Sequence, residues 1–418
     1  MAATVASTSV TDLALAAKAA ARKLATVDTA TKNRVLHAIA DALEARVPEI
    51  LEANARDLEA GRQSGLSDAL MDRLALDEKR VRAIADGARA VAALPDPVGE
   101  VVGGGRLYNG LEVRKVRVPL GVIAVVYEAR PNVTIDAAAL CLKSGNAVLL
   151  RGSSSATHSN AVLSRIAAEA TAELPDGWIG LVGGNREDLA DLATQEGVVD
   201  LLIPRGGEGL KKAISAVATV PVIYAAAGNC HVYVDASADL DAAERIIVNA
   251  KVQRPGVCNA AETLLVHSSV AEEFLPRALE ALRSHGVELR GDERVRAIDP
   301  TVAAATEADW GEEYLALILA VRVVDSVEEA IDHVNTYGSG HSEAIVTNDR
   351  ANARAFQLGI DSACVYVNAS TRFTDGGEFG MGAEIGNSTQ KLHARGPIGL
   401  RELCSTRYLV EGDGQIRA

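Results

Sequence analysis

Residues 121–152 read GVIAVVYEARPNVTIDAAALCLKSGNAVLLRG, and this stretch decides the fold class. The run VIAVVY is continuously apolar, the stretch IDAAALCLKSG has a helical pattern, and the run NAVLLRG is apolar again. Continuous apolar strands that alternate with helices are typical of a parallel sheet covered on both faces. We therefore predict a strand–helix–strand unit here.

The same alternation continues along the chain in two series. The first series adds the helical stretch THSNAVLSRIAAEA and the apolar runs WIGLVGG, VVDLLIP and VPVIYAA. The second series begins near Asn229 with CHVYVD and ETLLVH and continues with LALILAVRVV, SEAIVT and ACVYVN, between which lie helical stretches such as VEEAIDHV. The sequence thus predicts two α/β units.

The first hundred residues have helical periodicity instead. Asp28 is a candidate N-cap for a predicted helix. Val35, Ile39, Leu43 and Val47 then recur every four residues, which predicts one apolar stripe along that helix.

A hairpin is predicted after this helical region. The stretch GGGRLYNGLEVRKVRVP at 103–119 has Asn109-Gly110 as a turn signal, followed by valines that alternate with charged residues. A lone hairpin needs something to pack on. We therefore expect an arm at about 100–119 that makes oligomer contacts.

Composition and charge narrow the class of function. Among the 418 residues, Asp and Glu number 56 against 42 Lys and Arg, and the formal net charge is −14. This acidity, with only 3% aromatic residues, argues against a nucleic-acid partner and an anionic membrane surface. No apolar run reaches the ~18 residues of a membrane span. Five cysteines without a CxxC pair indicate a reducing, cytoplasmic location, and the scattered histidines predict no metal site.

Cys258 is the candidate nucleophile. In AKVQRPGVCNAAETLLVH it follows a Pro-Gly turn and lies four residues after Arg254, a setting that favours a thiolate. The alternative is a small buried core residue, which is how we interpret Cys141 and Cys364 inside their apolar runs. Gly, Pro and polar neighbours distinguish Cys258 from these two.

Three predicted strand ends carry polar or small residues. Asn132 follows VIAVVY, where it is either a donor to an oxyanion or a helix cap. Arg151-Gly152-Ser153-Ser154 follows AVLL, and Arg205-Gly206-Gly207 follows DLLIP. Free backbone N–H groups at helix starts suit phosphate oxygens, although tight strand–helix turns use the same residues.

Together these segments resemble the aldehyde dehydrogenase superfamily over roughly residues 10–418, and most of all its branch that acts on an acyl phosphate. The motifs that carry the resemblance are long. They are VYEARPNVTID, LCLKSGNAVLLRG, GNCHVYVD, QRPGVCNAAETLLVH, VEEAIDHVNTYGSGHSEAIVT and STRFTDGGEFGMGAEIGNSTQKLHARGP.

The resemblance implies an aldehyde-dehydrogenase-like α/β fold. It would comprise a Rossmann-like cofactor domain, an α/β catalytic domain that bears the thiol, and a small β oligomerisation arm. We expect the cofactor-binding domain at 1–228, the catalytic domain at 229–388, and a C-terminal return with an oligomerisation strand at 389–418. The strand STRYLV would match the C-terminal partner of the arm.

The resemblance also implies roles for single residues. Cys258 falls on the nucleophile, and Asn132 falls on the Asn that binds the oxyanion together with the nucleophile's backbone N–H. Glu313, in EEYLALILAV, resembles the Glu that holds the nicotinamide ribose. The other expected cofactor contacts are Arg151, Gly152, Ser153, Ser154, Arg205, Gly206, Gly207 and Phe379, and the expected substrate contacts are Arg254, Arg372, Ser370 and Thr371.

Two departures from the superfamily pattern bear on the chemistry. Hydrolytic members carry a Glu upstream of the cysteine, and that position falls at about Ala225 here, so no base is in place to activate water. The acid that binds the ribose 2′-hydroxyl in NAD-preferring members falls at about Ser154. A hydroxyl beside Arg151 tolerates a 2′-phosphate, where a carboxylate would repel it.

The resemblance thus implies NADPH-dependent reduction of L-glutamyl 5-phosphate to L-glutamate 5-semialdehyde and phosphate, through a thioester on Cys258, in proline biosynthesis. A glutamate 5-kinase would supply the acyl phosphate, and the chain would form a homo-oligomer. Two alternatives remain: a hydrolytic aldehyde dehydrogenase of the same superfamily, and a non-catalytic assembly protein with this fold.

Overall fold

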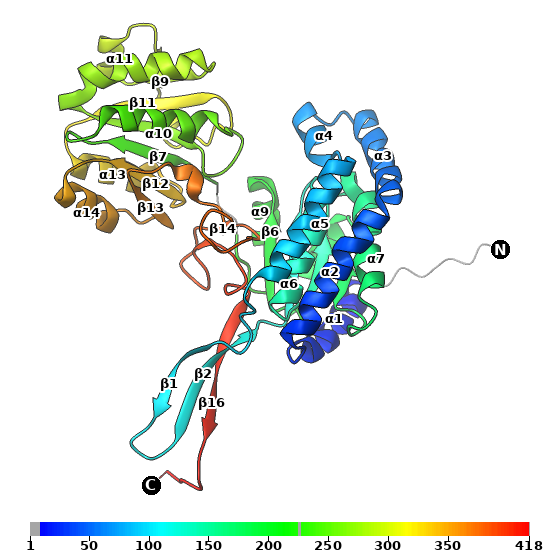
Figure 1. The fold of residues 1–418 in the computed structure, drawn as a ribbon. Coiled ribbons are helices and arrows are strands. Elements are labelled where there is room, and N and C mark those ends of the chain that lie inside the picture. The colour runs from blue at the N-terminus through cyan, green and yellow to red at the C-terminus, as the bar shows by residue number, and fades with distance from the viewer. Residues whose placement is uncertain (1–8, 225–226, 418) are drawn as a thin grey trace. The chain divides into compact units, whose positions relative to one another are not determined.

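A computed structural model describes residues 9–224 and 227–417 of the chain. The chain divides into two compact units, each with its own sheet and core (Figure 1). Unit 1 comprises Met1–Ala225, Gly380–Gly386 and Ile398–Ala418, and unit 2 comprises Ala226–Phe379 and Asn387–Pro397.

Unit 1 is built on a four-stranded parallel sheet of order β5-β4-β3-β6. Its strands are β3 (Val122–Tyr127), β4 (Ala147–Arg151), β5 (Ile179–Leu181) and β6 (Leu201–Arg205). Its helices are α1 (Val10–Leu24), α2 (Thr29–Ala45), α3 (Val47–Gln63), α4 (Asp68–Leu74), α5 (Glu78–Ala93), α6 (Asn132–Lys143), α7 (Thr157–Ala170), α8 (Arg186–Ala193) and α9 (Glu208–Ser215), with a short 3₁₀ turn, η1 (Ser154–Ala156). The predicted strand–helix–strand unit at 121–152 is confirmed as β3, α6 and β4.

The predicted N-cap at Asp28 is confirmed, because its side chain accepts the Thr31 N–H at 2.7 Å. Val35, Ile39 and Leu43 are buried along α2 as the stripe requires. The extension of that stripe to Val47 is wrong. Helix α2 ends at Ala45, and Val47 begins α3. A proline stands in the first turn of α3, where the N–H that proline lacks would have no partner within the helix.

The apolar run VPVIYAA is not a further strand of the unit 1 sheet. Among its described residues, Val222 forms an isolated bridge with Leu202 and no ladder follows. Ala225, the position at which hydrolytic relatives carry a Glu and this chain does not, lies outside the described residues. A short apolar run alone therefore did not distinguish a strand from an extended segment.

The hairpin arm is a three-stranded antiparallel sheet of order β1-β2-β16. It consists of β1 (Val101–Arg106), β2 (Glu112–Pro119) and β16 (Cys404–Glu411), which lie side by side in Figure 1. Gly110 in the turn has φ 87°, the left-handed conformation that glycine adopts without a steric penalty. The C-terminal strand pairs with β2 along its whole length, from Cys404 opposite Pro119 to Glu411 opposite Glu112.

Unit 2 is built on a seven-stranded parallel sheet of order β10-β9-β11-β8-β7-β12-β13. Its strands are β7 (Cys230–Val234), β8 (Ala261–His267), β9 (Glu288–Gly291), β10 (Ala303–Ala304), β11 (Ile318–Val324), β12 (Ser342–Val346) and β13 (Cys364–Val367), and β14 (Asn387–Ser388) and β15 (Gly396–Pro397) form a separate pair. Its helices are α10 (Leu240–Val252), α11 (Ser268–Ser284), α12 (Glu293–Ile298), α13 (Val327–Tyr337) and α14 (Arg350–Gly359), with 3₁₀ turns η2 (Glu307–Trp310) and η3 (Thr371–Phe373).

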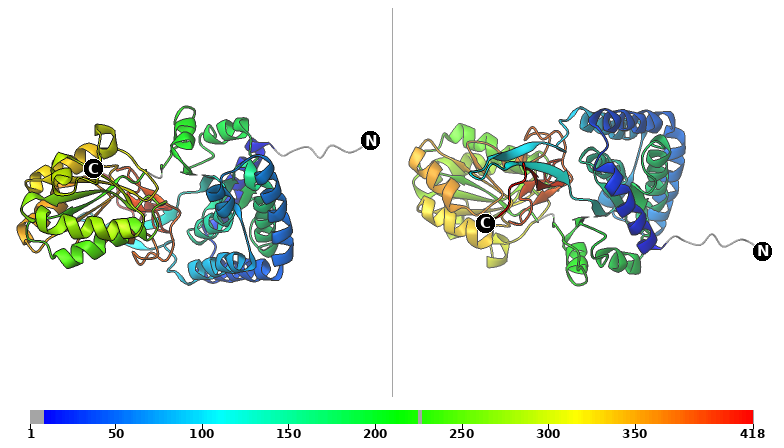
Figure 2. Two further views of the ribbon diagram at one scale, coloured as in Figure 1. Left: turned by 90° about the horizontal axis from the view of Figure 1, so that it is seen from above. Right: turned by 90° about the horizontal axis from the view of Figure 1, so that it is seen from below.

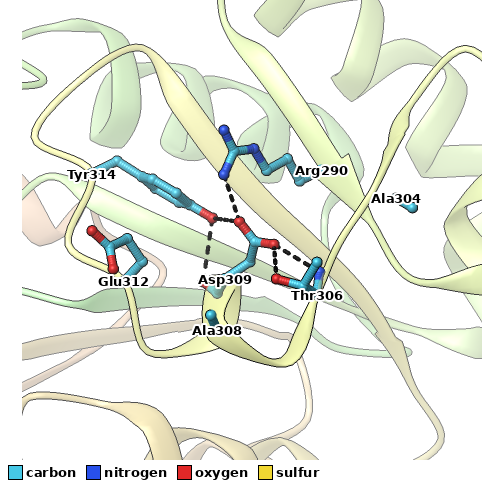
Figure 3. A pocket seen from close by; sticks show the side chains of 7 residues that line it. All are labelled: Arg290, Ala304, Thr306, Ala308, Asp309, Glu312 and Tyr314. Atoms are coloured by element: carbon cyan, nitrogen blue, oxygen red, sulfur yellow. Dashed lines mark hydrogen bonds and ion pairs between the residues drawn. The ribbon is translucent and has the colours of Figure 1, made fainter.

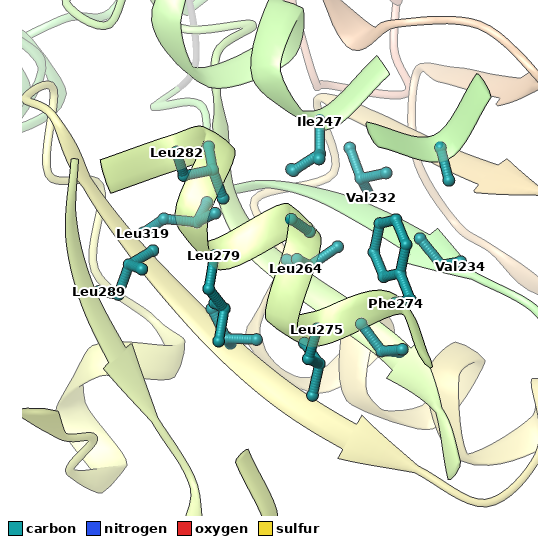
Figure 4. Close-up of a cluster of buried hydrophobic side chains, with 14 of the residues drawn as sticks. Val232, Val234, Ile247, Leu264, Phe274, Leu275, Leu279, Leu282, Leu289 and Leu319 are labelled. Atoms are coloured by element: carbon teal, nitrogen blue, oxygen red, sulfur yellow. The ribbon is translucent and has the colours of Figure 1, made fainter. Parts of the chain in front are cut away.

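Helices cover both faces of this sheet, as the continuous apolar strands predicted (Figure 2). On one face, Phe274, Leu275 and Leu279 of α11 pack against Val232 and Leu264 of the sheet (Figure 4). The other face packs against α13 and α14 in a smaller cluster. Each fully buried side chain of this size contributes about 1.5–3 kcal/mol of burial free energy, so the sheet is a rigid base for the loops at its edges.

Residues 389–418, expected as one C-terminal segment, divide between the units. Residues up to Pro397 belong to unit 2, and Ile398–Ala418 return to unit 1, where β16 completes the arm. None of the helices among residues 9–224 and 227–417 is long and apolar enough to cross a bilayer.

Candidate functional site

Cys258 lies on the loop between α10 and β8 of unit 2, at residues 253–260, which we call the Cys258 loop. The backbone of residue 228 packs directly against it. A Cβ on Gly228 would lie 1.4 Å from the Cys258 carbonyl oxygen, so only glycine fits there. Cys230 donates its S–H to the same carbonyl at 3.2 Å. The backbone of the candidate nucleophile is therefore held by the start of β7.

The five cysteines differ in accessibility. Cys258 is partly exposed, whereas Cys141, Cys230, Cys364 and Cys404 are buried. Burial raises the pKa of the thiols of Cys141, Cys230 and Cys404. Because a thiolate is the reactive form, Cys258 is the cysteine that the structure leaves open to a substrate.

A second loop clamps the Cys258 loop from the side. Thr371 donates its hydroxyl to the Asn259 carbonyl at 2.7 Å, and the Asn259 amide donates to the Thr374 carbonyl at 3.0 Å. Arg372 donates to the side-chain oxygens of Gln253, at 2.7 Å from Nε, and of Asn259. Both acceptors are neutral amides, so these bonds orient the Arg372 guanidinium without neutralising its charge.

Positive charge gathers beside the thiol. Burial and the neighbouring charge of Arg254 lower the pKa of Arg372, while the negative form of Cys258 acts in the opposite direction. Arg254 itself is exposed. The guanidinium groups of Arg372 and Arg254 thus act on one another's charge, and each offers forked donors to a phosphate or carboxylate.

Ser370 and Thr371, which were predicted as substrate contacts, do not present free hydroxyl groups at the surface. Ser370 is buried and its hydroxyl accepts the Arg372 N–H at 3.3 Å, while the buried Thr371 hydroxyl holds Asn259. In this structure both hydroxyls shape the loop. Their role as direct substrate contacts stays a prediction.

Glu313 connects to the same cluster through Gly228. Its carboxylate accepts the Gly228 N–H at 2.6 Å, and Gly228 packs on Cys258. Phe379 is exposed and meets the Tyr366 ring edge-on, at 6.3 Å between ring centroids. Unit 2 thus brings Cys258, Glu313 and Arg372 into one contiguous set of loops.

In unit 1 the predicted residues meet at the carboxyl edge of the four-stranded sheet. Asn132, after β3, is the first residue of α6, and its N-cap position is occupied by Pro131 with no side-chain cap bond. The helix-cap interpretation of Asn132 is therefore wrong. Its amide instead donates to the Asp136 carboxylate at 2.8 Å.

Arg151, at the end of β4, is buried and donates from Nη2 to the carbonyls of Gly184 and Asn185 at 2.9 and 2.8 Å. Its Nε is buried without a hydrogen-bond partner among the described residues. Gly152 packs against Asn160, where a Cβ would lie 1.9 Å from the side-chain nitrogen. An orphaned cationic donor next to an exposed Ser154 fits an anionic or ribose group of a nucleotide.

At the end of β6, the backbone N–H groups predicted to bind phosphate are not all free. The Gly207 N–H donates to the Glu128 carboxylate at 3.3 Å, and a Cβ on Gly206 would lie 2.7 Å from that carboxyl group. The Arg205 guanidinium lies against Gly386. Phosphate binding by Arg205, Gly206 and Gly207 therefore stays a prediction.

Sequence reasoning missed Gly228, Glu128 and Asp136. The signal for Asp136 was present, because residues four apart on a helix are neighbours, and Asn132 and Asp136 are four apart. Gly228 and Glu128 become informative only when the loops that approach them are known. Among the described residues, no group of three His, Cys, Asp or Glu side chains is arranged to hold a metal.

A surface cavity of about 440 Å³ lies elsewhere in unit 2, lined by Arg290, Ala304, Thr306, Ala308, Asp309, Glu312 and Tyr314 (Figure 3). Its polar groups bond to one another. Asp309 accepts from Arg290 at 2.7 Å, from Tyr314 at 2.8 Å and from the Thr306 hydroxyl at 2.7 Å. None of the residues predicted for chemistry lines it.

The profile of the aldehyde dehydrogenase family matches residues 2–297 and 284–407 of this chain. The chain belongs to this family. Proteins named gamma-glutamyl phosphate reductase are similar throughout: those of Syntrophomonas wolfei and Thermobifida fusca are 56% and 57% identical over 404 residues, covering 96% of this chain and 96% and 97% of theirs.

A solved structure is also similar to this chain. The crystal structure of gamma-glutamyl phosphate reductase from Thermotoga maritima superimposes with a TM-score of 0.96 at 48% identity, and covers 98% of this chain and all of that one. The α/β fold is thus that of an aldehyde dehydrogenase, and membership of the family implies a nicotinamide cofactor.

Proposed function

We propose that this chain reduces L-glutamyl 5-phosphate to L-glutamate 5-semialdehyde and phosphate, with NADPH as reductant, as a step of proline biosynthesis. The observation that carries the proposal is the accessible Cys258 thiol on a loop that also carries Arg254 and is bonded by Arg372. Relatives above 50% identity that carry the name gamma-glutamyl phosphate reductase support the choice of substrate.

The first step uses the Cys258 thiol as nucleophile. Its sulfur attacks the acyl carbon, the bond to the phosphate oxygen breaks, and phosphate leaves with the proton that the thiol loses. Arg372 and Arg254 hold the anionic groups of the substrate, because forked guanidinium donors match phosphate and carboxylate oxygens.

Asn132 and the backbone N–H of Cys258 stabilise the oxyanion that forms at the acyl oxygen. The Asn132 amide has two N–H donors, and Asp136 accepts one of them at 2.8 Å. Donors that point at a developing negative charge lower the barrier because they need no reorganisation. This role accounts for an Asn that does not cap its helix.

Bound NADPH would supply the hydride that reduces the thioester carbonyl. Glu313 is the residue that would hold the nicotinamide ribose, and Arg151 and Ser154 would hold the adenosine end, where the orphaned Arg151 Nε supports an anionic contact. A serine at 154 tolerates a 2′-phosphate, which favours NADPH over NADH. Cleavage of the carbon–sulfur bond then releases the semialdehyde and the Cys258 thiolate, which takes a proton from solvent to restore the thiol.

The substrate is a labile acyl phosphate, so a kinase that phosphorylates the side-chain carboxyl of glutamate, a glutamate 5-kinase, must supply it. The exposed arm formed by β1, β2 and β16 supports a homo-oligomer, since a thin three-stranded sheet with exposed apolar side chains needs a partner surface.

Replacement of Cys258 tests the proposal. Cys258→Ser is expected to abolish reduction and leave the fold intact, because a hydroxyl is a far weaker nucleophile than a thiolate. Cys364→Ser, at a buried cysteine of the same unit, is the matched control and keeps activity. Iodoacetamide followed by peptide mapping is expected to label Cys258 first. First labelling of Cys230 or Cys364, with an active Cys258→Ser, would contradict the proposal.

A further inference from the structure

Asp136 is a carboxyl group at the candidate site to which the proposed chemistry assigns no role. It lies on α6, one turn after Asn132, and its Oδ2 accepts the Asn132 Nδ2–H at 2.8 Å. On its other side it faces α5, where a Cβ on Gly87 would lie 3.7 Å from Oδ1. The partly exposed carboxyl thus lies between two helices and accepts a hydrogen bond from Asn132.

The helix that carries both residues is itself fixed. Between Asn132 and Asp136, the buried Thr134 hydroxyl is bonded to the Tyr127 hydroxyl at 2.7 Å and to Asn160 at 3.1 Å. These bonds tie the first turn of α6 to β3 and α7. The positions of Asn132 and Asp136 on the helix are therefore set by a buried network, and the remaining freedom is the rotation of the Asn132 amide.

We propose that Asp136 is a positioning residue that fixes the Asn132 amide with its nitrogen toward the carboxylate, so that the second N–H stays available to donate to an oxyanion. This inference rests on the proposed function of Asn132. A carboxylate only accepts hydrogen bonds, so an amide turned by 180° would place its own oxygen against that carboxylate. The wrong orientation is therefore excluded by charge as well as by the lost bond.

The electrostatic surroundings of Asp136 agree with this role. Burial raises the pKa of Asp136 to about 6, while the Asn132 hydrogen bond and the charge of Arg205 act to lower it. Such burial carries a cost for the charged form, which the bond to Asn132 and the nearby guanidinium offset in part. An apolar side chain at this position would avoid the cost of burying a charge. The presence of a carboxyl is therefore best explained by the hydrogen bond that it accepts from Asn132.

Two replacements separate the loss of the hydrogen-bond acceptor from the loss of charge, since Asn is close to Asp in volume and keeps an acceptor, whereas Leu is larger and has none. Asp136→Leu removes every acceptor, whereas the Oδ1 of Asp136→Asn can still accept the Asn132 N–H. We expect Asp136→Leu to lower kcat roughly 10- to 100-fold, the range for losing a hydrogen bond to a charged group, with little change in the KM for substrate. Asp136→Asn is expected to recover only part of that loss, because its own NH2 group also accommodates the turned Asn132 amide. Thermal midpoints of both variants show whether the fold is retained.

The double replacement tests whether Asp136 acts through Asn132. If it does, Asn132→Ala with Asp136→Leu has the same kcat as Asn132→Ala alone. Multiplied losses in the double variant would overturn the proposal, as would a normal kcat for Asp136→Leu or an Asp136→Asn as slow as Asp136→Leu. If Asn132→Ala itself keeps its kcat, the proposed oxyanion role of Asn132 fails, and this inference with it. A slow Asn132→Ala beside a normal Asp136→Leu overturns this inference alone.

Discussion

At the scale of single residues, the position of Cys258 depends on backbone contacts rather than on side-chain packing. Gly228 leaves no room for a Cβ against the Cys258 carbonyl, and Glu313 holds the amide of that glycine at 2.6 Å. Gly228 therefore lies in contact with both Glu313, which is proposed to bind the cofactor, and Cys258, the proposed nucleophile. Glu313 is thus connected through Gly228 to the loop that carries the thiol.

Arg372 is the residue whose replacement separates binding of the anion from thiol chemistry. Arg372→Gln is expected to lower kcat/KM for the acyl phosphate by about 10- to 100-fold, the loss expected for a charged hydrogen bond, and to leave the KM for NADPH unchanged. Steady-state kinetics with each substrate varied in turn measure both values. Arg354→Gln, at an exposed arginine of α14, is the matched control. Equal activity of the two variants would remove Arg372 from the substrate site.

The sequence predicted which residues are chemically unusual but not how their neighbours hold them. Cys258 was distinguishable by its Gly and Pro neighbours, and Asn132 by its place after an apolar strand. The choice between a cap and a donor for Asn132 needed coordinates, because a cap is defined by which N–H the side chain accepts. Likewise, only the fold shows that Glu128 occupies the amide of Gly207.

At the scale of elements, unit 2 carries a fully buried ion pair between α10 and β8. Lys251 donates from Nζ to Glu262 at 2.5 Å, and both side chains have no exposed surface. The second oxygen of Glu262 accepts the Leu315 N–H at 3.2 Å, on the segment that follows Glu313. The pair therefore connects the helix before the Cys258 loop with the loop that presents Glu313.

Breaking this pair is expected to destabilise the protein strongly. Lys251→Met leaves Glu262 buried without its cation, at a cost of roughly 3–5 kcal/mol, whereas Lys251→Met with Glu262→Leu costs much less because no charge remains. Denaturant unfolding of the three proteins gives these free energies. Similar losses in the single and double variants would contradict the account.

The stability of the Lys251→Met variant is also expected to depend on pH. Burial raises the pKa of Glu262 to about 7 even with Lys251 present, well above the ordinary value of 4.5. Because the pKa of Glu262 is higher in the folded state than in the unfolded state, its protonation stabilises the fold. This contribution to stability is fully present below about pH 4.5 and is lost as the pH rises through 7. The deficit of Lys251→Met relative to the unmodified protein is therefore expected to be smaller at pH 5 than at pH 8.

The alternation of apolar runs and helical stretches was enough to predict both parallel sheets. Each predicted run of the second series became a strand, namely β7, β8, β11, β12 and β13. The short strands β9 and β10 were missed, because ELRG and AA contain too few apolar residues to show a period. The run VPVIYAA was wrongly predicted as a strand, because it forms only a single bridge, between Val222 and Leu202, at the free edge of β6.

At the scale of the whole molecule, the chain's most exposed sheet is the arm. Both outer strands, β1 and β16, have one edge without a sheet partner among the described residues. Val101, Tyr408 and Val410 of the arm are 58%, 64% and 54% exposed. Unpaired edges with exposed apolar side chains are normally covered in a stable protein, so the arm is the surface best suited to contact a second copy.

The arm predicts an effect of surface substitutions on assembly. Tyr408→Ser with Val410→Ser removes apolar area from one face of β16 and is expected to lower the molar mass in solution, as measured by light scattering after size exclusion. Leu358→Ser, at a residue of α14 that is 74% exposed, is the matched control and leaves the mass unchanged. A mass equal to that of the unmodified protein in the arm variant would exclude the arm as the oligomer contact.

The fate of the acyl group on Cys258 tests the central claim most directly. A thioester can be released by water or by phosphate, and water is a poor nucleophile at neutral pH unless a base removes its proton. Phosphate is already anionic, and Arg254 and Arg372 lie near the thiol to hold it. The decisive measurement is NADPH formation from L-glutamate 5-semialdehyde and NADP, with and without phosphate.

Sustained NADPH formation is expected only when phosphate or arsenate is present, with at most one equivalent per active site without it. Sustained formation without phosphate, with free glutamate as the product, would contradict the account and make the protein a hydrolytic aldehyde dehydrogenase.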